Sequence, residues 1–139
     1  MGRKQWVSTV ATALWVAAAC RGEDARIVFT HALPALDGGR LESKIVEVTY
    51  GPGESSQPHS HPCAVIGYVL EGAVRMQVKG EPETTYKAGQ SFYEDPNGVH
   101  SISANASKTE LARFLAYFTC DHETPLTVPV HEGQHVEGK

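Results

Sequence analysis

Gly53 to Gly72 reads Gly-Glu-Ser-Ser-Gln-Pro-His-Ser-His-Pro-Cys-Ala-Val-Ile-Gly-Tyr-Val-Leu-Glu-Gly, and its centre is the triplet His59-Ser60-His61. On an extended strand, side chains two residues apart point to the same face. His59 and His61 can therefore present two imidazoles in one direction, which is the beginning of a metal site. A lone His-x-His triplet is more often a pair of surface histidines, but a third histidine, His100, follows later and favours the metal site.

The composition is that of a soluble globular protein with a single domain. The chain has 139 residues, of which 41% are hydrophobic and 20% are charged, and this length suits one domain better than two. Its 13 glycines and 8 prolines favour a turn-rich β fold over a helix bundle. The net charge is −4 and the chain has no basic run, so nucleic acid is not an expected partner.

The hydrophobic pattern predicts short strands throughout and no confident helix. Many short strands at close spacing are typical of a β-sandwich or barrel. Residues 121–139 are mostly polar and are expected to lie over the surface. The segments that we predict to be strands are residues 27–29, 45–50, 64–70, 73–78, 84–86, 91–94, 99–104 and 111–119.

The N-terminal segment has the layout of a secretory signal peptide. Met1 to Lys4 contains two basic residues, residues 7–19 are mostly apolar or small, and the segment ends in three alanines. A run this short is a better match to a signal peptide than to a membrane span. We therefore expect a signal peptide over residues 1–19, cleaved after Ala19, and a single mature domain over residues 20–139.

The three cysteines suggest two further features of an exported protein. Cys20 would be the first mature residue, and the sequence before it resembles a bacterial lipoprotein processing site, although Ala17 stands where a larger aliphatic residue is usual. A periplasmic or extracellular protein and a lipoprotein anchored at Cys20 both remain open. Cys63 and Cys120 would meet an oxidising compartment and could pair there, but the sequence does not show whether they meet.

The first motif of the cupin superfamily resembles the stretch that contains the histidine pair. That motif is Gly, five residues, His-x-His, three or four residues, Glu, six residues, Gly. Gly53, His59, His61 and Gly72 match it, and Val65 occupies the position of the Glu.

The second cupin motif runs from a Gly to a His eleven positions later through a Pro-x-Gly turn. Gly89 and His100 fit that span, with the turn one place later than usual. The two motifs together resemble small single-domain cupins of the quercetin-dioxygenase-like kind. The resemblance implies an all-β, double-stranded β-helix, the jelly-roll cupin barrel, with its core over about residues 40–120.

The resemblance also implies that His59, His61 and His100 hold one divalent transition metal, which could be Fe, Mn, Ni or Zn. Val65 cannot bind a metal. Three neutral imidazoles would leave the charge of the ion uncompensated, with positions open to water, dioxygen or an anionic bidentate substrate. The missing Glu is equally compatible with a weaker site or an empty one.

Other side chains compete for roles at this site. Cys63 could supply a thiolate ligand, but a disulfide or a small buried cysteine is at least as probable. Glu94 and Tyr93 are the candidates for catalytic residues: Glu94 could act as a base or accept a hydrogen bond from a ligand, or it could be a solvated strand end. Tyr68, Phe92 and Tyr93 could line the pocket, although aromatic residues in strands more often belong to the core.

Two functions follow from these expectations. One is an exported metal-dependent dioxygenase or isomerase that acts on a small chelating organic substrate. The alternative is a non-catalytic cupin that binds a small ligand or a metal and has a vestigial site, so whether the protein is an enzyme stays open. The resemblance also implies a homodimer through the outer sheet faces, where Tyr68 and Val69 would offer apolar surface.

Overall fold

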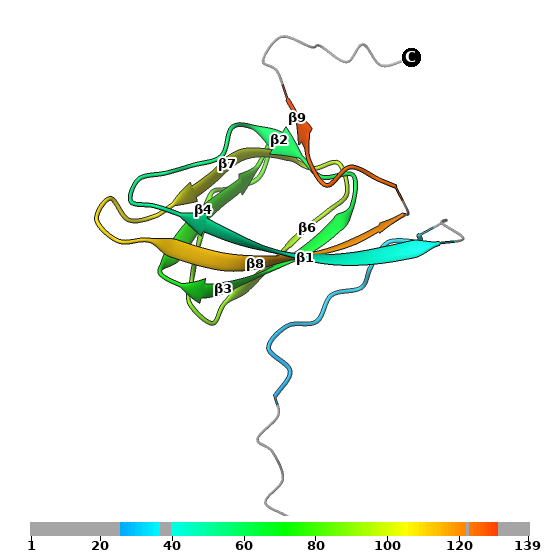
Figure 1. Cartoon of the computed structure of the whole chain (residues 1–139), viewed down its shortest axis with the longest axis horizontal. Helices are drawn as coiled ribbons and strands as arrows, with labels where there is room; N and C mark the ends of the chain where they lie inside the picture. The colour runs from blue at the N-terminus through cyan, green and yellow to red at the C-terminus, as the bar shows by residue number, and fades with distance from the viewer. Residues whose placement is uncertain (1–25, 37–39, 122, 131–139) are drawn as a thin grey trace, which may run out of the picture.

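The computed structural model describes residues 26–36, 40–121 and 123–130, and in this part of the chain it consists of strands and turns without any helix (Figure 1). None of these residues forms a helix long and apolar enough to cross a membrane. The expected signal peptide and Cys20 lie outside the described residues. The strands are β1 (Leu41–Tyr50), β2 (His59–Ser60), β3 (Ala64–Glu71), β4 (Ala73–Val78), β5 (Thr84–Lys87), β6 (Ser91–Glu94), β7 (Val99–Asn105), β8 (Ala112–Asp121) and β9 (Val128–Pro129).

The strands form two antiparallel sheets that enclose the interior of a jelly-roll barrel, as the motifs predict (Figure 1). One sheet has the order β1-β8-β3-β6 and the other the order β5-β4-β7-β2-β9. β1 begins at Leu41, earlier than the sequence predicts, because it pairs with β8 over its whole length, from Leu41 opposite Asp121 to Tyr50 opposite Ala112. Strands adjacent in the chain lie in different sheets except β4 and β5, which pair with each other, and both sheets contribute residues to the interior.

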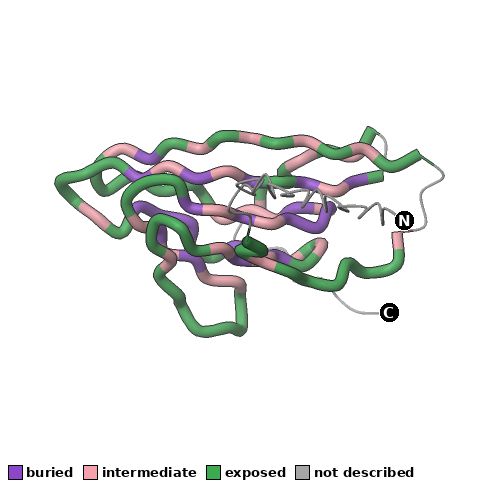
Figure 2. Tube along the Cα trace, turned by 90° about the horizontal axis from the view of Figure 1, so that it is seen from below, coloured by how far each residue is buried: buried purple, intermediate pink, exposed green. Residues whose placement is uncertain are grey.

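The core is built by the period-2 alternation of the strands. Along β8 every second residue is buried, and the residues between them face outward. Figure 2 shows the same alternation along several strands, with exposed residues concentrated in the connecting loops. Removing these apolar side chains from water is the main stabilising contribution to such a barrel. The buried residues of β8 are Ala112, Phe114, Ala116, Phe118 and Cys120.

A close contact between a glycine and an aromatic ring fixes β6 against β3. Gly67 and Phe92 are direct partners in the antiparallel pair. A Cβ atom on Gly67 would lie 2.0 Å from the Phe92 ring, so the ring occupies the space that any larger residue would need. Phe92 is consequently a core residue, and the strand that carries Glu94 is held at a defined position.

The segment after β8 returns to the barrel, whereas the sequence predicts that it lies over the surface. Leu126 packs against the core, and β9 pairs with β2, with Pro129 opposite His59. Just before this segment, Cys120 forms a disulfide with Cys63. The polar composition of this segment does not reveal that it docks, because one apolar side chain and two strand residues are enough to hold it against the barrel.

Two further expectations are wrong. Residues 26–36 contain no strand, and Ile27 is 86% exposed. Val69 offers no surface, because its side chain is fully buried on the inner face of β3. Tyr68, its neighbour in the chain, is half-buried, and its position in the alternation of β3 places it on the outer face. The expected interface therefore retains Tyr68 and loses Val69.

Candidate metal centre

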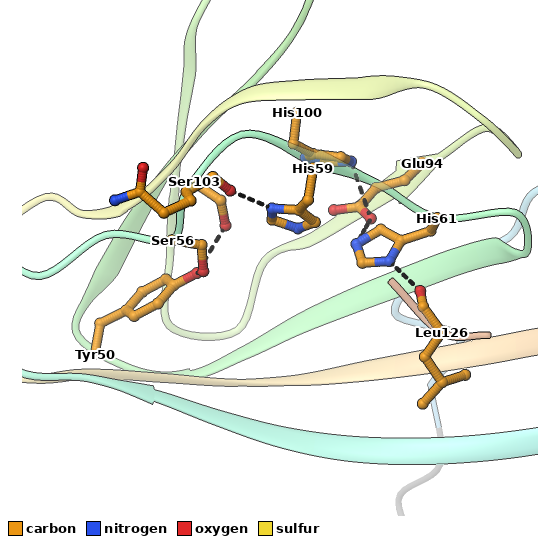
Figure 3. A network of polar contacts seen from close by, with 9 residues as sticks. Tyr50, Ser56, His59, His61, Glu94, His100, Ser103 and Leu126 are labelled. Carbon is orange, nitrogen blue, oxygen red and sulfur yellow. Dashed lines mark hydrogen bonds and ion pairs between the residues drawn. The ribbon is translucent and has the colours of Figure 1, made fainter. Parts of the chain in front are cut away.

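Three buried side chains from different strands converge inside the barrel: His61 just after β2, Glu94 at the end of β6, and His100 on β7. Glu94 Oε2 lies 3.2 Å from His100 Nε2 and 3.6 Å from His61 Nε2. One ligand atom from each residue lies within 4.8 Å of the others. Figure 3 shows the two imidazoles directed at the carboxylate. This is the spacing of groups that could share a single cation.

His59 lies beside this group. It is the direct partner of His100 in the β2–β7 pair, so the two side chains share a face. Its ring stacks on that of His100, with centroids 5.3 Å apart, and its centroid lies 4.8 Å from that of His61. The three histidines expected from the sequence are therefore brought together. His59 is more exposed than the other two and is not part of the tight group of three.

Backbone carbonyls fix the orientation of two imidazoles. His61 Nδ1 lies 2.5 Å from the carbonyl oxygen of Leu126, and His59 Nδ1 lies 2.7 Å from that of Gln57. A carbonyl oxygen can only accept a hydrogen bond, so each Nδ1 carries the proton. Each Nε2 then has a free lone pair. Metal-binding histidines have the same arrangement, in which one ring nitrogen donates to an oxygen and the other binds the metal.

The site contains two buried polar atoms that have no hydrogen-bond partner. These atoms are Glu94 Oε2 and His100 Nε2, which lie close together without hydrogen-bond geometry. Buried polar atoms are nearly always paired, so such a pair calls for an explanation. A divalent cation between them would satisfy both, and two imidazoles with one carboxylate suit zinc, iron, manganese or nickel. The residues present therefore fit the metal that the motifs imply.

The electrostatic environment keeps His61 available as a ligand. Burial lowers the pKa of His61 below its usual value, and this effect outweighs the Leu126 carbonyl and the charge of Glu94, which both raise it. The imidazole is therefore neutral near pH 7. A neutral imidazole is the form that binds a metal.

Glu94 on β6 lies directly opposite Val65 on β3, the position at which the first cupin motif has its glutamate. Val65 and Glu94 are direct partners in the β3–β6 pair, both are buried, and partners of this kind project to the same face of the sheet. A carboxylate at Glu94 therefore enters the interior beside the place where one at residue 65 would enter. The sequence offers Glu94 only as a base or hydrogen-bond acceptor, because no motif spacing reveals which residue lies opposite Val65.

The other candidates from the sequence lie elsewhere. Cys63 is in the disulfide, so it supplies no thiolate. Tyr93 stacks on His31 with ring centroids 3.6 Å apart, and it does not line the large cavity described below. Burial and, after it, the charge of Asp95 raise the pKa of Tyr93, so its phenol stays protonated near pH 7 and is not available as a base. Tyr68 does not line that cavity either.

His59 and His61 open onto a cavity of about 410 Å³ between the two sheets. His59, His61 and Glu94 lie in its wall, most of which is apolar. The segment after β8 contributes Leu126, Thr127 and Pro129. Pockets of this size accommodate small organic molecules. The apolar wall residues contributed by β1, β4 and β8 are Val46, Val48, Met76, Phe114, Ala116 and Phe118.

The sequence profile of the cupin domain family matches residues 46–118, which is more than half of the chain. The chain belongs to the cupin family. This match includes all three histidines, Val65 and Glu94, so the departure from the usual motif occurs within a true cupin domain. No protein of curated function matches the sequence.

Solved structures support the same fold. A cupin-like protein from Thermotoga maritima is 27% identical, with a TM-score of 0.56, over 63% of this chain and 64% of its own. An oxalate oxidase in complex with the substrate analogue glycolate is 25% identical, with a TM-score of 0.55, over 63% of this chain and 46% of its own. A polyketide cyclase from Streptomyces resistomycificus is 23% identical, with a TM-score of 0.54, over 68% of this chain and 64% of its own, and it shows the fold alone. The cupin thus spans less than two thirds of the length of each of these proteins.

Proposed function

We propose that this cupin holds one divalent transition metal between His61, Glu94 and His100, with His59 as a further ligand, and uses it to bind a small chelating organic molecule. The observation that carries the proposal is the buried pair Glu94 Oε2 and His100 Nε2, which has no hydrogen-bond partner. The carboxylate of Glu94 replaces the one that Val65 lacks, so the ion has partial charge compensation. When bound, the metal supplies a Lewis acid with open positions for ligand oxygens.

The proposed chemistry is that of an oxygenase or isomerase. It is supported by the cavity that adjoins the histidines, because an apolar wall excludes bulk water from a bound substrate. It is also supported by the oxalate oxidase among the similar structures, whose activity is a property of that protein.

A non-catalytic ligand-binding cupin is the second candidate, and the cavity wall favours it. Apart from the histidines, Glu94 and Tyr50, no residue that lines the cavity can titrate. If Glu94 binds the metal, no separate carboxylate remains in the wall to act as a general base. Turnover of diketones, flavonols and thiols under air separates the candidates: the enzyme consumes one of them, whereas the binding protein retains ligands unchanged.

An exchange of two residues tests the metal site. Glu94→Val should strongly weaken binding of Zn²⁺, measured by metal analysis and calorimetry, because the three imidazoles then lack the carboxylate. Val65→Glu combined with Glu94→Val should restore much of the affinity, because the carboxylate returns from the neighbouring strand. Glu47→Val, on the exposed outer face of β1, is the matched control and should bind like the wild type. Wild-type protein that stays metal-free after loading would refute the proposal.

We also propose that the mature cupin is exported. The disulfide between Cys63 and Cys120 supports this, because disulfides persist in oxidising compartments. It also leaves Cys20 as the unpaired cysteine, which favours a lipid anchor there. Intact-mass measurement on protein from an export-competent host should show loss of residues 1–19, with an added acyl mass if Cys20 is lipidated. Retention of Met1 would contradict export.

A further inference from the structure

Three hydroxyl groups that have no role in the proposed metal site converge in the wall of the same cavity. Tyr50 ends β1, Ser56 lies in the following loop, and Ser103 lies on β7. The Tyr50 hydroxyl is 2.6 Å from Ser56 Oγ and 2.9 Å from Ser103 Oγ. All three residues line the same cavity as His59, His61 and Glu94, and Figure 3 shows the hydroxyls and the imidazoles in one view.

The backbone holds this hydroxyl cluster in place without help from the hydroxyls. The amide of Ser56 donates to the carbonyl of Ser103 at 2.9 Å, which ties the loop to β7. The side-chain amide of Asn105 donates to the carbonyls of Tyr50 and Gly51, which fixes the end of β1. Because these contacts already fix the backbone, the hydroxyl groups are not required to keep the three residues together. Their position is preorganised for another partner.

A count of protons shows that the cluster has spare hydrogen-bonding capacity. Three hydroxyls have three protons and six lone pairs. The two contacts within the cluster use two protons and two lone pairs, so one proton and several lone pairs remain. A group entering the cavity can therefore either accept a hydrogen bond from the cluster or donate one to it.

The rest of the wall restricts the chemistry of that group. No lysine or arginine lines the cavity, and most of its wall is apolar. A charged group placed there would lose its hydration without a counter-charge, which is costly. An uncharged hydroxyl or carbonyl would lose little, because the cluster replaces its water.

We propose that Tyr50, Ser56 and Ser103 form a recognition subsite for an uncharged hydroxyl or carbonyl oxygen on a largely apolar small molecule. The proposed metal function is needed only for the other, chelating end of that molecule. The apolar walls hold its body by burial of hydrocarbon surface. The subsite selects against analogues that lack the oxygen, because a site built to hydrogen-bond an oxygen leaves its own groups unpaired when the oxygen is missing.

The test uses two probes on the full metal-free protein: 4-phenylphenol, which carries the oxygen, and biphenyl, which lacks it. We expect wild-type protein to bind 4-phenylphenol about five- to tenfold more tightly than biphenyl, as one net hydrogen bond predicts. In the variant Tyr50→Phe/Ser103→Ala this ratio should fall to about one while the affinity for biphenyl stays the same. The unchanged biphenyl affinity shows that the variant is folded.

Tyr117→Phe is the matched control, since it removes a hydroxyl that contacts Ser43 on the outer face of the barrel. It should leave the ratio of the two affinities unchanged. Equal affinity of the wild type for both probes, or a preference that survives in the variant, would overturn the subsite. The metal function is tested separately with biphenyl-3,4-diol, a chelating probe. Equal affinity of this diol for metal-loaded and metal-free protein contradicts the proposed function and does not affect the 4-phenylphenol ratio.

Discussion

At the scale of single residues, the position of the carboxylate depends on packing that surrounds it. Glu94 reaches the histidines because β6 lies in a fixed register on β3, and the Phe92 ring fits over Gly67. Glycine is required here by space, because a Cβ would overlap the ring at 2.0 Å. The proposed metal centre thus depends on a contact between two residues that are not themselves proposed ligands.

Gly67→Ala should destabilise the cupin by about 1–3 kcal/mol, the usual cost of an added carbon in a packed core. The measurement is the free energy of unfolding in urea. Gly67→Ala combined with Phe92→Leu should recover part of the loss, because the smaller side chain makes room. Gly51→Ala is the control: its added carbon meets only the flexible end of the Glu54 side chain, at 3.1 Å. If Gly67→Ala unfolds like the wild type, the register of β6 on β3 is wrong.

At the scale of elements, the segment after β8 completes the site. It supplies the carbonyl of Leu126 to His61, it pairs with the strand of His59, and it closes one side of the cavity. The disulfide between Cys63 and Cys120 holds the strand from which it departs. The segment therefore positions the proposed metal ligands although it contributes none.

A chain that ends at Glu123 should bind Zn²⁺ about 10- to 100-fold more weakly, because loss of the partner behind a metal-binding histidine typically costs that much. Calorimetry on the purified variant measures this. A chain that ends at Val130 keeps Leu126 and should bind like the full protein. Leu126→Ala keeps the carbonyl, so it should retain most of the affinity and separates the carbonyl from the side chain. Full affinity in the chain that ends at Glu123 would exclude this role.

The disulfide should stabilise the barrel mainly by lowering the conformational entropy of the unfolded chain. The two cysteines are separated by 57 residues, and closing a loop of that length is worth about 4 kcal/mol in the chain-entropy description. Cys63→Ala/Cys120→Ala should therefore lower the free energy of unfolding by roughly this amount. Cys20→Ala is the control and should have no effect. Equal stability of oxidised and reduced wild type would show that the bond does not contribute.

At the scale of the whole molecule, the outer face of the sheet β1-β8-β3-β6 presents a row of apolar residues. Ile45, Tyr117 and Ile66 are successive partners across three strands, and Ile45 is 64% exposed. The next row contains Leu115 and Tyr68 beside the exposed Glu47. A largely apolar face of this kind, bordered by charged residues, is typical of an interaction surface. We therefore keep the prediction of a homodimer and place its interface here.

Light scattering at micromolar concentration should give the mass of a dimer, and Ile45→Lys should shift it to the monomer. Charged groups are depleted at the centre of interfaces because they lose hydration there. Leu41→Lys, at another exposed position at the start of the same strand, is the control and should have a smaller effect. A wild-type protein that is monomeric at this concentration would contradict the predicted interface.

The sequence by itself determined the features that depend on local spacing. Alternation with period 2 is a property of neighbouring residues, so the strands of the barrel and the shared direction of the His59 and His61 side chains follow from it. The span from Gly89 to His100 is likewise a count along the chain, and with the first motif it predicted the cupin barrel. These predictions need no knowledge of which strands pair.

Only the tertiary structure decided which distant residues meet. That Glu94 lies opposite Val65, that Leu126 accepts from His61, and that Cys63 meets Cys120 all depend on the register between strands far apart in the chain. A shift by one residue reverses the face of every side chain, and nothing local in the sequence fixes that register. For the same reason the sequence could place neither Val69 in the interior nor the hydroxyl of Tyr50 beside Ser103, since the pairing of whole sheets sets both.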